Sequence, residues 1–137
     1  MTMFQNRHYC LTREVKGPFA EAVAATREAL ATEGFGVLTE IDVQATLAKK
    51  LEVTTRPYLI LGACNPGLAH RALQIDPAIG TLLPCNVVVA EDEQGRVSVA
   101  AIDPVAMFAV VENPALTPIV DDVRARLQRA LAALSPR

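Results

Sequence analysis

The sequence is poor in aromatic residues and has no cluster of basic ones. Its 137 residues include no Trp, two Tyr and four Phe, and 13 Lys and Arg stand against 15 Asp and Glu, for a formal net charge of −2. Binding to nucleic acid needs clustered cations and stacking aromatic rings. The composition therefore argues against a nucleic-acid partner.

The chain also lacks the apolar segments that direct a protein to a membrane or out of the cell. No apolar run reaches the roughly 20 residues of a membrane span, and the first ten residues lack the apolar core of a signal peptide. Three cysteines, an odd number, do not suggest the disulfide framework of a secreted domain. We therefore expect a cytoplasmic protein with no membrane partner.

No catalytic signature of a common enzyme class is present. The sequence has no GxSxG, HExxH, P-loop or Rossmann glycine pattern, so neither a reaction nor a cofactor is predicted. A chain of this length forms one domain, residues 1–137, and buries roughly two thirds of its unfolded surface. Hydrophobic residues make up 51% of it and the mean hydropathy is +0.26. This apolar surplus favours a homodimer over a monomer.

The stretch from residue 58 to residue 91 carries the strongest local signals. Tyr58–Ala63 is an unbroken apolar run, which is typical of a strand buried on both faces. Asn65 is a favourable N-cap and Pro66 a favourable first helical residue, so a helix is predicted to begin at Pro66. It should end before Pro77, because a residue that precedes proline disfavours the helical conformation.

Local patterns predict the remaining elements. Asp42 is a natural N-cap for a helix with an apolar stripe of Val43, Leu47 and Leu51. Further strands are expected at His8–Glu14, Val37–Ile41, Cys85–Glu91 and Val97–Ile102, and further helices from Gly17-Pro18 to Glu33 and from Thr117 onward, whereas Val105–Val111 fits either a short helix or a strand. This order predicts an α+β fold, a two-layer domain with helices packed on a mixed, partly antiparallel sheet.

Five short motifs spread along the chain resemble one protein family. They are FGVLTEIDV at Phe35–Val43, LGACNP at Leu61–Pro66, the Ala69-His70 pair, IGTLLPC at Ile79–Cys85 and IDP at Ile102–Pro104. Together they resemble the bacterial and archaeal domain of unknown function 302 (DUF302) family over almost the whole chain. The resemblance implies a small α/β domain that tends to form dimers. It implies no established reaction, substrate or cofactor, so it informs the fold far more than the function.

The candidate ligand-binding residues lie around the predicted start of the central helix: Cys64, Asn65, His70 and Cys85. Cys64 stands just before a helix N-terminus, where the helix dipole lowers the pKa of a thiol. Asn65 either caps the helix or leaves its amides open to an anion. His70 is an acid–base group, a polar residue on the outer face of the helix or an interface residue in a dimer. If the two flanking strands are antiparallel neighbours, both sulfurs lie at one edge of the sheet; if they are parallel, the sulfurs lie at opposite ends.

Two functions fit these residues. The first is a homodimer that binds a small ligand or a protein partner and has no established catalysis. The alternative is a thiol-dependent redox or metal-binding protein that uses Cys64 and Cys85, with His70 nearby. Lone cysteines without CxxC spacing are not a zinc signature, and free cysteines usually behave as small buried hydrophobes. The missing catalytic motifs and the apolar surplus favour the first.

Overall fold

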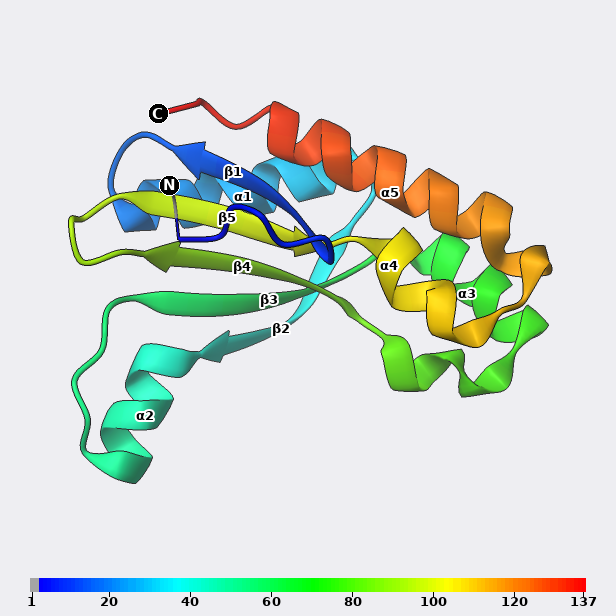
Figure 1. The fold of residues 1–137 in the computed structure, drawn as a ribbon, viewed down its shortest axis with the longest axis horizontal. Coiled ribbons are helices and arrows are strands. Elements are labelled where there is room, and N and C mark those ends of the chain that lie inside the picture. Colours follow the sequence, from blue (N-terminus) through cyan, green and yellow to red (C-terminus); the bar gives the residue numbers. More distant parts are fainter. Residues whose placement is uncertain (1–2) are drawn as a thin grey trace.

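A five-stranded sheet forms the centre of the computed structural model, which describes residues 3–137 (Figure 1). The strands are β1 (Cys10–Val15), β2 (Gly36–Asp42), β3 (Tyr58–Cys64), β4 (Cys85–Glu91) and β5 (Val97–Ile102), in the spatial order β1-β5-β4-β3-β2. The two-layer α+β class predicted from the sequence is confirmed. Residues 1 and 2 of the predicted domain lie outside the described part of the chain.

Every pairing described in the sheet is antiparallel, where the sequence led us to expect a mixed sheet. The reason is the position of two helices, α2 (Val43–Leu51) and α3 (Pro66–Ile75). Neither carries the chain back along a face of the sheet, as the helix of a parallel crossover does. Instead each lies near one end of the strands (Figure 1), so the next strand returns beside the previous one and Ala63 pairs with Cys85.

Two long helices, α1 (Phe19–Thr32) and α5 (Thr117–Ala132), cover one face of the sheet. Alternate strand residues point toward them, as the period of two in a strand requires. The largest wholly buried side chains of this main core are Leu30, Leu61, Val87, Val89, Val97, Val99 and Leu127. None of the helices within residues 3–137 is long and apolar enough to cross a membrane.

A second apolar cluster lies beyond the end of the sheet. It joins α3 to the 3₁₀ segments η1 (Pro77–Leu82) and η3 (Pro114–Leu116), to α4 (Pro104–Phe108) and to the start of α5. Its buried members are Leu68, Ala72, Ile79, Leu116, Ile119 and Val120. The stretch that fitted either a helix or a strand is helical, as α4 and the 3₁₀ segment η2 (Ala109–Val111), because Asp103 accepts a capping hydrogen bond from the amide of Val105 at 3.0 Å.

Several details differ from the sequence-based expectations. β1 begins at Cys10 rather than His8. The Thr117-Pro118 pair was expected to supply the cap and the first residue of the last helix, but Thr117 is itself the first residue of α5, because η3 runs directly into the helix. α2 begins and ends where predicted, yet its apolar stripe is not buried: Leu51 remains 65% exposed. The stripe lies beyond the main core, so the chain covers Val43 and Leu47 only in part.

Candidate functional site

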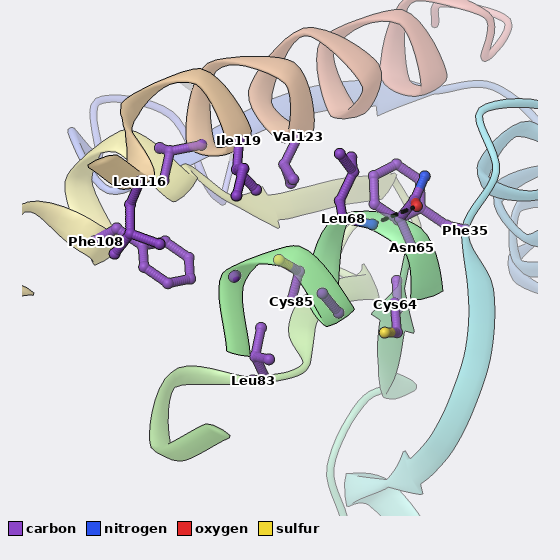
Figure 2. A pocket seen from close by; sticks show the side chains of 14 residues that line it. Phe35, Cys64, Asn65, Leu68, Leu83, Cys85, Phe108, Leu116, Ile119 and Val123 are labelled. Carbon is purple, nitrogen blue, oxygen red and sulfur yellow. Dashed lines mark hydrogen bonds between the residues drawn. The ribbon is translucent and has the colours of Figure 1, made fainter. Parts of the chain in front are cut away.

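An apolar cavity of about 40 Å³ lies where the two apolar clusters meet (Figure 2). Phe108 and Leu116 stand at one end of it, and Phe35 and Asn65 at the other. The described residues that line it are Phe35, Ala63, Cys64, Asn65, Leu68, Ala69, Ala72, Leu83, Cys85, Phe108, Leu116, Ile119, Val120 and Val123. Of these fourteen, only Asn65 and the two cysteines carry a polar group on the side chain. The cavity therefore favours apolar contents.

Asn65 holds the corner at which β3 passes into α3. Its side-chain Oδ1 accepts a hydrogen bond from the amide of Leu68 at 3.3 Å, and its carbonyl accepts one from the amide of Ala69 at 2.9 Å. This is the predicted N-cap, and α3 begins at Pro66 as the sequence indicated. The capping interaction occupies Oδ1, so the cap reading of this residue fits the structure.

The other side of Asn65 faces a glycine in the turn between α1 and β2. Gly34 has a φ of +85°, in the left-handed region, and a Cβ added to it would lie 2.9 Å from Nδ2 of Asn65. Arg126 closes the same turn from α5 by donating to the carbonyl of Glu33 at 3.0 Å. Three segments that are distant in the sequence thus fix the position of Asn65 beside the cavity.

Substitution of Gly34 by Ala is expected to lower the free energy of unfolding by about 1–2 kcal/mol, because an L-residue is strained in the left-handed region and the new methyl group would press on Asn65. Chemical denaturation followed by circular dichroism measures the change. Gly36→Ala is the matched control, since its added Cβ meets nothing within 4 Å. Gly95→Ala, with a φ of +80° and the same open space, separates backbone strain from the contact. Equal losses in G34A and G36A would contradict this account.

The antiparallel pairing brings Cys64 and Cys85 to the same end of the sheet and into the wall of one cavity. All three cysteines lie in the described part of the chain and are free thiols. Burial, and to a lesser extent nearby Cys64, raise the pKa of the Cys85 thiol to about 11. Burial also raises the pKa of Cys64 and of Cys10 above the ordinary value.

These pKa shifts oppose the thiol chemistry considered from the sequence. The dipole at the start of α3 was expected to lower the pKa of Cys64, but loss of hydration on burial is the dominant effect and raises it. The reactive form of cysteine is the thiolate, which a raised pKa makes scarce at neutral pH. Both cysteines therefore fit the role of small apolar residues in the cavity wall.

His70 does not join the other three candidate residues. It is exposed on α3 and lies outside the group that lines the cavity. Within residues 3–137 there is no group of three or more His, Cys, Asp or Glu side chains arranged to hold a metal ion. The structure thus brings together Cys64, Asn65 and Cys85 only.

Most residues of the cavity wall were not predicted from the sequence. Phe35 precedes β2, Phe108 ends α4 and Ile119 belongs to the first turns of α5. Each is one apolar residue among many in a chain that is half hydrophobic. No spacing marks them as partners, because the sheet and α5 bring them together across large distances in the sequence.

Comparison with known proteins agrees with this architecture. A family model described as "Domain of unknown function DUF302" matches residues 11–134. The chain belongs to the DUF302 family. A solved DUF302 structure, the uncharacterized conserved protein from Bacillus stearothermophilus, is 30% identical in sequence and superposes with a TM-score of 0.87. The match covers 93% of this chain and 99% of the other.

None of the curated proteins compared matches this DUF302 chain. The family model and the solved structure confirm the family resemblance inferred from the five motifs, and the match extends over both the sheet and the helices that enclose the cavity. The family supplies a fold and no activity. Any function has to be argued from the site itself.

Proposed function

We propose that this chain is a homodimeric binding domain whose cavity at the Cys64–Pro66 corner takes a small apolar ligand, or an apolar group of a larger one. The cavity is the observation that supports this proposal, because its wall is almost wholly apolar. An apolar group that enters the cavity gains dispersion contacts with the apolar side chains of its wall. The volume of about 40 Å³ suits a group the size of a xenon atom or an ethyl end of an alkyl chain.

The antiparallel pairing brings Cys64 and Cys85 into one cavity wall, as the thiol-dependent alternative requires, but the raised pKa of both thiols disfavours the thiolate that it needs. His70 is exposed and does not line the cavity. A cytoplasmic location remains part of the proposal. It rests on the odd number of cysteines, which does not suit a secreted disulfide framework.

Xenon tests the cavity directly. We expect xenon dissolved in the sample to shift the amide NMR signals of residues around the cavity in a saturable way and to leave the outer strands unchanged. Ala72→Val should abolish these shifts, because residue 72 lines the cavity, is 5% exposed and would project its added methyl groups into the space. The measurement is a ¹H–¹⁵N correlation spectrum at increasing xenon pressure.

Ala24→Val is the matched control, since Ala24 is an exposed residue of α1 away from the cavity. This variant should respond to xenon as the unaltered protein does. The proposed site would be refuted by shifts spread evenly over the whole domain, or by shifts that survive unchanged in A72V.

A further inference from the structure

The sheet face turned away from α1 and α5 carries almost no charge. The strand registers place Ile41, Ile60, Val88 and Ile102 on this face, which we call the open sheet face. Among the described strand residues that share it, Glu14 alone is charged, and Arg137 pairs with it at 3.2 Å. An antiparallel sheet with one face in water normally alternates apolar and polar residues. Here the apolar side chains of the second face stand beside uncharged polar ones, Thr12, Thr39, Asn86 and Ser98, and Ala90, Ser98 and Ala100 are already buried within the single chain.

β3 has the sequence of a strand buried on both faces but is buried on only one. Its sequence, Tyr-Leu-Ile-Leu-Gly-Ala-Cys, has the pattern of a strand buried on both faces. Leu59 and Leu61 are indeed buried under the helices, at 6% and 0% exposure. Tyr58 and Ile60, which point the other way, are only partly covered in the single chain. The sequence is thus suited to a second covering layer.

α2 continues this apolar surface. The structure describes every residue of α2, and none of them is buried. Leu51 is 65% exposed, and Ile41 on the neighbouring strand is 49% exposed. Val43 and Leu47 line a hollow together with Met3 and Tyr58. Met3 and Tyr58 also line a second hollow that reaches Val88 and Ala100 on the open sheet face. The helix and the open sheet face therefore form one surface.

The solvent-accessible surface of the single chain is larger than expected for a monomer of its mass. A monomeric protein of 14.7 kDa is expected to expose about 6,900 Å². This chain exposes 7709 Å², which is about 800 Å² more. A standard interface buries about 800 Å² on each partner. The excess is therefore close to what one subunit contributes to a stable dimer.

We infer that a second copy of this chain covers the open sheet face and α2, with the two sheets packed face to face about a two-fold axis. This inference rests on the proposed homodimer and names its interface. A face with an apolar patch and a single charged strand residue is complementary to itself, which a two-fold interface requires, and packed sheets lie about 10 Å apart with interdigitating side chains. The resulting dimer has four layers, helices outside and two sheets within.

Charge introduced on the open sheet face tests the interface. Val88→Glu and Ile41→Arg should each raise the dimer dissociation constant by at least about 100-fold, because two-fold symmetry places two like charges in an apolar interface. Sedimentation and light scattering measure the mass. Val110→Glu is the control: Val110 is 74% exposed in η2, away from the open sheet face, and its variant should remain dimeric.

Each outcome decides a separate point. A monomeric unaltered protein would overturn both the homodimer and the interface. A dimer that dissociates in V110E, or that persists in both V88E and I41R, would leave the homodimer standing and overturn the interface. If V88E does not fold by circular dichroism, I41R decides, since half-exposed Ile41 contributes little to the core. The melting temperature of the unaltered protein should rise with concentration, as for any dimer, and that of I41R should not.

Discussion

Substitution of Leu127 by Ala is expected to lower the free energy of unfolding by about 3–5 kcal/mol, the range found when a wholly buried leucine is truncated. Leu127 is 0% exposed in the middle of α5, where it packs into the main core beneath the sheet. The loss has two parts, the lost transfer free energy of the removed carbon atoms and the cavity that close-packed neighbours cannot fill. Since small domains are stable by only about 5–15 kcal/mol, this single change removes a large share.

Urea denaturation followed by far-ultraviolet circular dichroism checks this expectation. All variants are compared at one protein concentration, because the stability of the proposed dimer would depend on it. Val110→Ala is the control for an apolar truncation at a 74% exposed site and should change the free energy by less than about 0.5 kcal/mol. A loss under about 1 kcal/mol in L127A would mean that α5 is not anchored as described.

The elements that the sequence predicted well are those fixed by signals within a few residues. Asp42 and Asn65 each accept the capping hydrogen bond that their positions indicated, at 2.9 Å and 3.3 Å. α2 therefore begins at Val43 and α3 at Pro66. A cap and a following proline act through adjacent backbone amides, so no knowledge of the rest of the fold is needed to recognise them.

Such local signals could not predict whether neighbouring strands run parallel or antiparallel. A helix between two strands gives a parallel pair when it packs along the sheet and an antiparallel pair when it stays beyond the strand ends. α3 stays beyond the ends, because its buried residues Leu68 and Ala72 pack on η1, η3 and α5 rather than on the sheet. The cavity also depends on this placement of α3. The sequence indicated Cys64 and Cys85 from local signals, but it could not indicate the aromatic residues on the opposite wall, because only the fold brings them there.

α2 shows how a correct prediction of secondary structure leaves packing open. Its stripe of Val43, Leu47 and Leu51 was expected to be buried, and its helical bounds are as predicted, yet the main core of the single chain does not reach it. An amphipathic pattern states that one face avoids water without naming what covers it. In the proposed dimer, the covering surface comes from the second copy of the chain.

Alkaline pH should destabilise the fold through Cys85. The pKa of its thiol is about 11 in the folded chain against an ordinary value of 9.0, because burial disfavours the thiolate. The folded state thus holds its proton more tightly than the unfolded state does. The stabilisation is fully present below pH 9 and is lost as the pH rises from 9 to 11, at roughly 1.4 kcal/mol per pH unit and about 2–3 kcal/mol in total.

The measurement is the free energy of unfolding between pH 7 and 11 for the unaltered protein and for Cys85→Ala. The variant starts lower at pH 7, because it loses a buried side chain, and its curve should then fall less steeply, so that the two converge toward pH 11. Taking the difference removes the titration of lysines and tyrosines, which both proteins share. Cys10→Ala is the matched control and should keep most of the steeper fall, since it retains Cys85 and Cys10 itself is only partly buried. Parallel curves for the unaltered protein and C85A would show that Cys85 ionises alike in the folded and unfolded chain, and the cavity wall at that position would then be open to water.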